Sequence, residues 1–251
     1  CFNAAGEAVN YILRGVNPAY ETILGLPAEA VLNQTGDVAY ATAEPPYLSL
    51  YARVALTGEA ERFETYFPPL EKWFAISVAP WGARGFATLF TDITARQQQQ
   101  RQLEQLAHYD ALTGLPNRVL LADRLDMALA QTERDQQLLA VCYLDLDGFK
   151  AVNDRLGHEV GDQVLVEVAR RLQETLRGAD TVARLGGDEF VLLITGLDTV
   201  EDCAPALERL LRVLAQPYAL GHERINLSAS IGVALYPLDQ GDPDSLLRHA
   251  D

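Results

Sequence analysis

The chain has 251 residues, enough for one large or two ordinary domains, and its 49% hydrophobic and 22% charged residues are typical of globular proteins that bury a core. The net charge of −15, without any Lys/Arg-rich block, argues against a nucleic-acid-binding surface. Its three widely spaced cysteines exclude a disulfide scaffold and a cysteine-type zinc site, and they suit a reducing compartment.

Targeting signals are absent from the sequence. No apolar run approaches the length of a membrane span and no signal peptide is present, so we expect a cytoplasmic protein or the cytoplasmic part of a membrane-anchored one. The chain starts at Cys1 instead of Met and stops at Asp251 inside a predicted helix. We therefore expect it to be a piece of a longer protein.

The first 94 residues are predicted to form a small α+β domain. Asn17 can cap a short helix that starts at Pro18 and is ended by Gly25. A loop-rich region with turn residues follows, from residue 27 to about residue 46. Alternating side chains then predict three strands of an antiparallel sheet, at residues 61–67, 72–79 and 85–91.

Short motifs in this domain match those of a known family. They are Asn-Pro-Ala-Tyr at 17–20 with Gly25, and the closing Asp-Ile-Thr at 92–94. With this order of elements, residues 1–94 resemble a PAS sensor domain. PAS domains often bind haem, flavin or small metabolites. Residues 1–94 contain no His and no Met, which argues against haem held through His, and Cys1 is the only cysteine there for a flavin adduct. A small-ligand sensor and a ligand-free packing module both stay open.

Residues 95–107 are rich in glutamine, contain Leu103 and Leu106 and lack Pro and Gly, which predicts a linker helix. Its apolar stripe is too short to establish a coiled coil. A helix that leaves a PAS domain is the usual signalling connector in proteins similar to this one. The alternative is a solvated spacer helix.

The second domain is predicted to span residues 108–251. After the segment at 108–118, an amphipathic helix covers Arg118–Asp135, and the apolar run at 138–144 predicts a central buried strand. This strand leads into Asp145 and Asp147, at a strand end where α/β proteins collect ligands. We expect these two side chains to face opposite sides of the strand, with Asp147 as a turn or helix-entry residue.

Two polar side chains flank the next glycine-containing loop. The amide of Asn153 can read a purine edge, and the carboxylate of Asp162 can accept from the N1–H and the exocyclic amine of guanine. Taken alone, Asp162 is better explained as a helix N-cap. Lys150 would sit near any phosphate held at the turn before it.

Gly186 and Gly187 separate two apolar runs and are followed by Asp188 and Glu189. This pattern predicts a β-hairpin, because glycine accepts the positive φ of tight turns. A tip without Cβ atoms lets a large ligand approach the backbone, and adjacent carboxylates favour a divalent metal. The alternative is a solvated hairpin with an acidic tip.

The last part of the chain is predicted to contain a helix at 200–215, strands at 224–228 and 231–236, and a helix that starts at Asp244. The order β-α-β-β-α-β, with a helix in front, predicts a ferredoxin-like palm domain.

Six motifs in this domain carry a family resemblance: Asp-Leu-Asp-Gly-Phe-Lys at 145–150, Asn-Asp at 153–154, Gly-His at 157–158, Gly-Asp at 161–162, Arg-Leu-Gly-Gly-Asp-Glu-Phe at 184–190, and Ser-Ile-Gly-Val-Ala at 230–234. In order and spacing they resemble the GGDEF family, the diguanylate cyclases, as does the entry segment Asp-Ala-Leu-Thr-Gly-Leu-Pro-Asn-Arg at 110–118. The chain is therefore expected to be an α+β protein, a PAS fold followed by a ferredoxin-like GGDEF domain related to the cyclase and polymerase palms.

The resemblance implies that two GTP condense into cyclic di-GMP and two pyrophosphates. It implies two Mg²⁺ or Mn²⁺ ions per active site, with Asp145, the backbone carbonyl of Leu146, and Asp188 as ligands. The implied catalytic residues are Asp188 (also the base for the 3′-hydroxyl), Glu189 and Lys150. The implied GTP contacts are Phe149, Lys150, Asn153, His158, Asp162, Gly186 and Gly187.

Arg177 and Asp180 form an Arg-x-x-Asp motif that five residues separate from Gly186, and this motif resembles the family's inhibitory product site. Arg and Asp can bind a guanine edge or a phosphate. The alternative is that Arg177 caps a helix and Asp180 shapes a turn. Because one domain holds one GTP, the reaction implies a homodimer, formed through the PAS domain and the linker helix. The family's next segment carries a Lys and an Arg that hold the triphosphate, so full activity is expected of the longer protein.

Two other functions stay open. One is a regulatory module that binds GTP or cyclic di-GMP and controls a neighbouring domain, such as a phosphodiesterase. The other is an interaction scaffold. The intact set of Asp145, Lys150, Asp188 and Glu189 favours the enzyme, because a pure binder need not keep every metal ligand.

Overall fold

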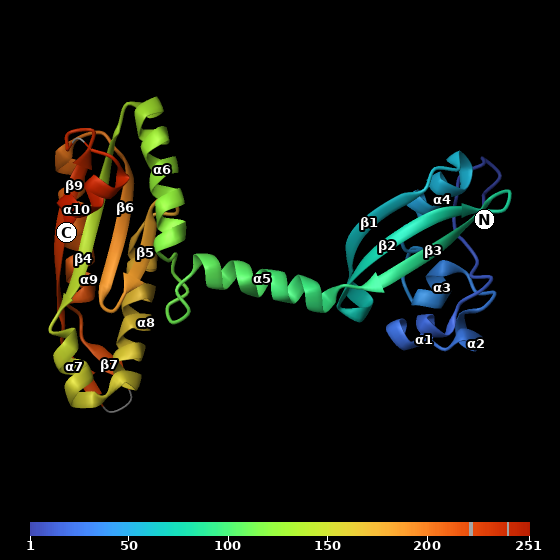
Figure 1. Cartoon of the computed structure of the whole chain (residues 1–251), viewed down its shortest axis with the longest axis horizontal. Coiled ribbons are helices and arrows are strands. Elements are labelled where there is room, and N and C mark those ends of the chain that lie inside the picture. Colours follow the sequence, from blue (N-terminus) through green and yellow to red (C-terminus); the bar gives the residue numbers. More distant parts are fainter. Residues whose placement is uncertain (221–222, 240) are drawn as a thin grey trace. The chain divides into compact units, whose positions relative to one another are not determined.

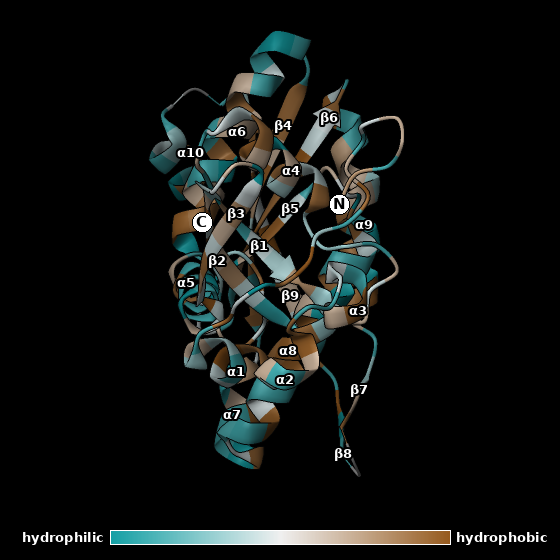
Figure 2. Ribbon diagram, turned by 90° about the vertical axis from the view of Figure 1, so that its right-hand side faces the viewer, coloured by the Kyte–Doolittle hydropathy of each residue, from teal (hydrophilic) through white to brown (hydrophobic). Residues whose placement is uncertain are grey.

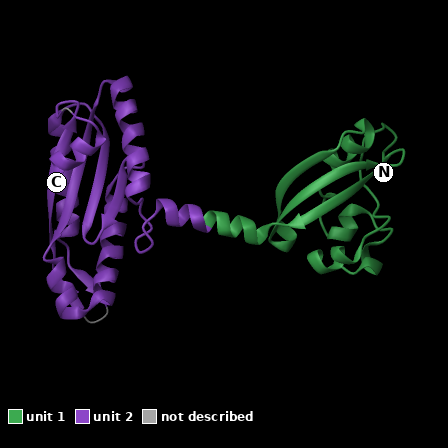
Figure 3. Ribbon diagram, in the orientation of Figure 1, with its two compact units in different colours: residues 1–101 green, residues 102–251 purple. Residues whose placement is uncertain are grey.

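The structure is a computed structural model that describes residues 1–220, 223–239 and 241–251. The chain divides into two compact units, residues 1–101 and 102–251 (Figure 3). Each unit contains its own cluster of buried hydrophobic side chains. Within the described ranges, no helix is long and apolar enough to cross a membrane.

Unit 1 is a three-stranded antiparallel sheet in the order β1-β2-β3, accompanied by short helices (Figure 1). The strands are β1 (Glu61–Phe67), β2 (Lys72–Trp81) and β3 (Gly85–Asp92). The helices are α1 (Pro18–Leu24), α2 (Ala28–Val31), α3 (Gly36–Tyr40), α4 (Leu48–Thr57) and the 3-10 turn η1 (Pro68–Leu70).

Local sequence signals set the first helix as predicted. The Asn17 side chain accepts a hydrogen bond from the Tyr20 backbone N–H at 3.1 Å, and Gly25 ends the helix in the left-handed region at φ 70°. The three strands are also confirmed. The loop-rich region predicted at 27–46 also contains two short helices that were not predicted, α2 and α3. Helices of four and five residues are too short to show an apolar period.

The predicted linker helix is confirmed as α5 (Thr94–His108). Figure 2 colours it mostly as hydrophilic, and Leu103 and Leu106 are 62% and 60% exposed. Near its start the helix is held by unit 1, where Arg96 pairs with Glu64 at 2.5 Å and the Arg101 guanidinium lies 5.4 Å from the Trp73 ring centroid. Its apolar side chains are therefore free of contacts that would bury them within the described chain.

Unit 2 is built on a four-stranded antiparallel sheet in the order β5-β6-β4-β9 (Figure 1). Its strands are β4 (Leu138–Asp147), β5 (Thr181–Gly186), β6 (Glu189–Leu197) and β9 (Ser228–Tyr236). Helices α6 (Arg118–Asp135) and α10 (Pro243–Ala250) pack on one face. Helices α7 (Phe149–Leu156), α8 (His158–Thr175) and α9 (Cys203–Leu214) pack on the other.

Unit 2 contains the predicted β-α-β-β-α-β elements in order, with an extra helix and an extra pair of short strands. The helix at Arg118–Asp135 has its predicted bounds, and β4 runs three residues further than predicted. The strand predicted at 224–228 is wrong. Residues 223–225 form β8 (Glu223–Ile225), which pairs with β7 (Tyr218–Leu220), and β9 already begins at Ser228. The helix predicted at 200–215 begins as the 3-10 turn η2 (Val200–Asp202).

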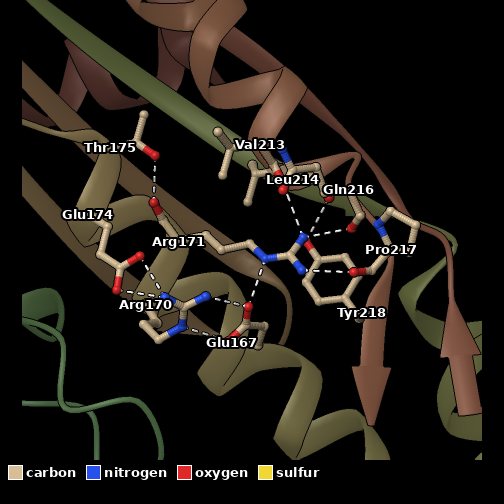
Figure 4. A network of polar contacts seen from close by, with 10 residues as sticks. All are labelled: Glu167, Arg170, Arg171, Glu174, Thr175, Val213, Leu214, Gln216, Pro217 and Tyr218. Atoms are coloured by element: carbon tan, nitrogen blue, oxygen red, sulfur yellow. Dashed lines mark hydrogen bonds and ion pairs between the residues drawn. The ribbon is translucent and has the colours of Figure 1, made fainter.

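A buried arginine fixes the position of α8 (Figure 4). The Arg171 guanidinium packs 3.9 Å from the Tyr218 ring centroid and pairs with Glu167 at 2.9 Å. It also donates to three backbone carbonyls in the last turn of α9 and just after it, those of Val213, Gln216 and Pro217, at 3.1, 2.6 and 3.0 Å. Because the buried cation has hydrogen-bond partners on every side, it ties α8 to the chain around β7.

Acid should weaken this network in a defined range of pH. Hydrogen bonding to Arg170 first, and then to Arg171, lowers the pKa of Glu167 from 4.5 to about 2. Since the folded pKa lies below the unfolded one, the stability that Glu167 contributes is complete above pH 4.5 and is lost as the pH falls toward 2. Urea titrations at several pH values give the free energy of unfolding between pH 4.5 and 2. In wild type this free energy should fall as the pH falls, and the fall should be smaller in Glu167→Gln. The exposed control Glu208→Gln should behave like wild type, and an equal fall in wild type and Glu167→Gln would contradict the role of Glu167.

Candidate functional site

The predicted hairpin is formed by β5 and β6, with Gly187 and Asp188 as its turn. Gly186 and Gly187 have φ of 144° and 52°, and a Cβ added at either would meet no atom within 4 Å. The backbone here is therefore both in a conformation that favours glycine and open to a large ligand. Asp188 and Glu189 are half-buried beside it.

The buried side chain of Arg184, a residue that is 8% exposed, anchors the turn. Its guanidinium donates to the Gly187 carbonyl at 2.7 and 3.0 Å and to the Asp110 carboxylate at 2.9 and 3.1 Å. Burial opposes ionisation of Asp110, but hydrogen bonds from Thr113 and the pairing with Arg184 together hold its pKa below the usual value. The entry segment and the glycine turn, 74 residues apart at this contact, are thus one structural unit.

Asp145 lies next to the hairpin carboxylates. Leu144 pairs with Phe190, so the next residues outward, Asp145 and Glu189, extend toward the same end of the sheet. Burial raises the pKa of Asp145, and the charges of Asp188, Asp147 and Glu189 raise it further. This crowding of negative charge favours a bound cation.

The structure corrects the prediction for Asp147. Because β4 continues to Asp147, Asp145 and Asp147 stand two residues apart on one strand and share a face, with buried Leu146 between them. Both Asp147 oxygens are engaged: they accept from the hydroxyls of Ser228 at 2.7 Å and Ser230 at 2.9 Å. Asp147 is therefore a strand residue that joins β4 to β9, not a turn or helix-entry residue.

Sequence reasoning missed Tyr143, which faces the same side of β4 as Asp145. Burial raises the pKa of Tyr143 to about 12, and its interaction with Glu189 contributes to the rise. The hydroxyl therefore stays protonated and can hold the Glu189 carboxylate. The only sequence signal was that Tyr143 is the single polar tip in the apolar run at 138–144.

The start of α7 directly follows β4. Gly148 adopts a left-handed conformation at φ 80°, and Phe149 is buried as the first helical residue. No side chain of the described residues caps this end of the helix, so its first backbone N–H groups can bind an anion, and exposed Lys150 follows Phe149 there.

The predicted base-reading residues lie where α7 meets α8. Asn153 is in α7, and its side-chain Oδ1 is buried without a hydrogen-bond partner in the described structure. His158 is the exposed first residue of α8. The N-cap interpretation of Asp162 is wrong, because Gly157 precedes the helix and Asp162 is its fifth residue.

Asp162 is exposed and lines an open hollow of about 350 Å³ on the outer side of α8. Its apolar walls include Leu112 from the entry segment and Leu220 from β7. A carboxylate beside apolar walls suits a flat base that carries N–H donors.

The segment between α8 and β5 supports the turn interpretation of Asp180. Its carboxylate accepts from the backbone N–H groups of Arg177 at 3.0 Å and Thr195 at 3.2 Å. The Arg177 side chain is exposed. The structure places the two residues together, with the arginine directed by a turn that Asp180 holds.

The oxygen donors fit a hard divalent cation. Across the residues that are described, no three His, Cys, Asp or Glu side chains are grouped as a closed metal site. The predicted donors come instead from two elements: Asp145 and the Leu146 backbone carbonyl belong to β4, and Asp188 belongs to the turn between β5 and β6. Such a partial oxygen shell suits Mg²⁺ or Mn²⁺ that shares its remaining positions with water and phosphate.

Comparison with known proteins gives a match for unit 2. The family model "Diguanylate cyclase, GGDEF domain" matches residues 107–251. The bifunctional diguanylate cyclase/cyclic di-GMP phosphodiesterase MucR of Pseudomonas aeruginosa is 49% identical over 158 residues, 63% of this chain and 23% of that protein. Diguanylate cyclase TpbB of the same species is 41% identical over 156 residues, 62% of this chain and 36% of that protein. The chain thus spans about a quarter to a third of these relatives.

A solved structure shows the same fold. The crystal structure of a sensory box/GGDEF family protein from Caulobacter crescentus matches with a TM-score of 0.55 and 42% identity. The match covers 57% of this chain and 93% of that one. Unit 2 therefore has the mixed α/β fold of its structural neighbours.

Proposed function

Because the chain belongs to the GGDEF family of diguanylate cyclases, we propose that it condenses two GTP molecules into cyclic di-GMP and two pyrophosphates. One observation carries the proposal: burial, and then the charges of Asp188 and Glu189, raise the pKa of Asp145, which lies near the end of β4, beside the open glycine turn. A solvated acidic hairpin would not need a second strand to bring a third carboxylate to it. The crowded negative charge supports a site that works with a cation and a phosphate.

Cyclases of this family use divalent metal ions. We assign Asp145, the Leu146 carbonyl and Asp188 as the residues that would hold two Mg²⁺ or Mn²⁺ ions. Ions held by these residues would supply positive charge that neutralises the phosphates and the departing pyrophosphate. Asp188 also accepts the proton of the attacking 3′-hydroxyl, and Glu189 adds a second carboxylate beside it. Tyr143 supports Glu189 from within the sheet.

The substrate contacts follow the course of the chain after β4. Free N–H groups at Phe149 and the ammonium of Lys150 bind phosphate, and Gly186 and Gly187 let the nucleotide approach. Asn153 and Asp162 read guanine, with His158 nearby at the start of α8. These groups align two reactants and neutralise charge, which is most of what phosphoryl transfer requires.

The experiment that tests this function compares nucleotides. The full-length protein, with Mg²⁺ or Mn²⁺, should convert GTP into a cyclic dinucleotide and leave ATP unchanged, as followed by chromatography of the products. Equal conversion of ATP, or binding of GTP without any conversion, would contradict the cyclase assignment.

A second candidate is a GTP- or cyclic di-GMP-binding module that controls a neighbouring phosphodiesterase. The observation that favours it is the similarity to MucR, whose name includes both activities, and to the Escherichia coli cyclic di-GMP phosphodiesterase PdeR. Binding of GTP without conversion is the outcome expected of such a module.

Product feedback is proposed at Arg177 and Asp180. Cyclic di-GMP should bind there with micromolar affinity, roughly −8 kcal/mol, through charge-assisted contacts to Arg177. Arg177→Ala should remove product inhibition and spare GTP turnover, because the exposed side chain does not support the fold. Calorimetry with cyclic di-GMP checks this. Unchanged product binding in the variant would exclude Arg177 from the inhibitory site.

We further propose that unit 1 is a PAS sensor that controls a homodimer through α5. A helix turns by about 100° per residue, so one residue inserted after Gln100 should rotate the following chain and reduce cyclic di-GMP synthesis. Seven residues, close to two turns, should largely restore it. Synthesis is measured at matched dimer content. If cyclic di-GMP synthesis does not depend on the length of the insertion, α5 is only a tether.

A further inference from the structure

The contact between α7 and α8 depends on a residue without a side chain. Gly161 is buried in the first turns of α8, and it faces Phe149 and Asn153, which lie four residues apart on one side of α7. A Cβ built on Gly161 would overlap the Asn153 Oδ1 and would lie 2.9 Å from its Cγ and 3.3 Å from the Phe149 Cζ. Any larger residue at position 161 must therefore displace the Asn153 amide.

The same amide is left with an unused acceptor. Among the described residues, the buried Asn153 Oδ1 has no hydrogen-bond partner. Burying an acceptor in this way is unfavourable, so a structural role alone would place an apolar side chain here. The unpaired oxygen is therefore consistent with an acceptor for a hydrogen bond from a bound ligand.

The backbone of Gly161 does not itself require glycine. It lies within α8, and its φ is not among the positive values found at eleven other glycines of the described residues. Glycine within a helix is unfavourable by propensity. Glycine is needed at position 161 because the Asn153 side chain occupies the space that a Cβ would take.

We propose that Gly161 determines base specificity: its missing side chain lets α8 approach α7 closely enough to hold the Asn153 amide where it reads guanine. This rests on the proposed function. Gly161 is a positioning residue, since it acts only through Asn153. The ligand class is a purine nucleotide that presents an N–H donor to the amide oxygen.

The test is a double-mutant cycle of Gly161→Ala, Asn153→Ala and the double variant. Binding of the guanosine and adenosine α,β-methylene triphosphates with Mg²⁺ is measured by calorimetry. Each single variant should bind the guanosine analogue about tenfold more weakly, and the preference over adenosine should narrow by the same factor. The double variant should be no weaker than Asn153→Ala, because the alanine at 153 leaves room for the added methyl group. Gly15→Ala, where a Cβ meets no atom within 4 Å, is the control substitution.

Three results would overturn the inference: full guanine preference in Gly161→Ala, additive losses in the double variant, or a double variant that fails to fold. If Gly161→Ala alone fails to fold, recovery of the fold in the double variant supports an overlap with Asn153, and its guanine preference must equal that of Asn153→Ala. Failure of the proposed function would look different, since the wild-type protein would then show no preference for the guanosine analogue.

Discussion

Asp188→Ala is expected to abolish cyclic di-GMP synthesis, with a loss of more than about a hundredfold in rate. Asp188 is assigned both as a metal ligand and as the base for the 3′-hydroxyl, so no other group replaces it. Its half-buried place in the turn contributes little to the core, and the melting temperature should therefore change little. Turnover is measured by chromatography of the dinucleotide product.

The control for this experiment is Glu208→Ala, which removes an exposed carboxylate on α9, away from the site. It should leave synthesis unchanged, because the net charge changes by the same amount without loss of a ligand. Turnover at the wild-type level in Asp188→Ala would exclude both roles that are assigned to Asp188.

Arg184→Met should destabilise unit 2 by about 3 kcal/mol, because it leaves the Asp110 carboxylate without its buried partner. It should also lower synthesis strongly, since the Gly187 carbonyl loses the guanidinium that fixes the turn. Urea unfolding followed by circular dichroism checks the first effect, and product formation checks the second.

The exposed pair of Arg53 and Glu61 provides the matched control. Arg53→Met removes an ion pair of the same chemistry, but water screens this pair, so the loss in the free energy of unfolding should be much smaller than for Arg184→Met. If the two arginine substitutions lower the free energy of unfolding equally, the buried pairing of Arg184 with Asp110 is not a special feature of the site. If Arg184→Met loses stability but keeps full synthesis, the anchor does not position the turn.

Local patterns predicted the elements that local physics controls. The cap at Asn17, the glycine at 25 and the leucines of α6 each act over a few residues, and the structure has them as predicted. The short helices α2 and α3 were missed because they depend on burial against the sheet of unit 1. The PAS assignment of unit 1 stays a prediction.

The candidate site was also predictable only where neighbouring residue types determine the structure. The hairpin around Gly186 and Gly187 could be predicted from residue types, whereas the partner that anchors it could not, because Asp110 lies 74 residues from Arg184. The facing of Asp147 was predicted wrongly, because side chains two residues apart on a continuing strand share a face. Its turn or helix-entry role was also wrong, because β4 includes Asp147 and two serines of β9 engage its carboxylate. The network around Arg171 depends on backbone carbonyls, which leave no sequence signal.

The central claim is that Asp145 and Asp188 hold divalent ions against the phosphates of GTP. The most direct test is a crystal structure with Mn²⁺ and the α,β-methylene analogue of GTP, with manganese located by its anomalous scattering. Anomalous peaks should lie about 2–2.6 Å from oxygens of Asp145, Asp188 and the Leu146 carbonyl, beside the nucleotide phosphates. A bound nucleotide whose manganese contacts neither carboxylate would contradict the account.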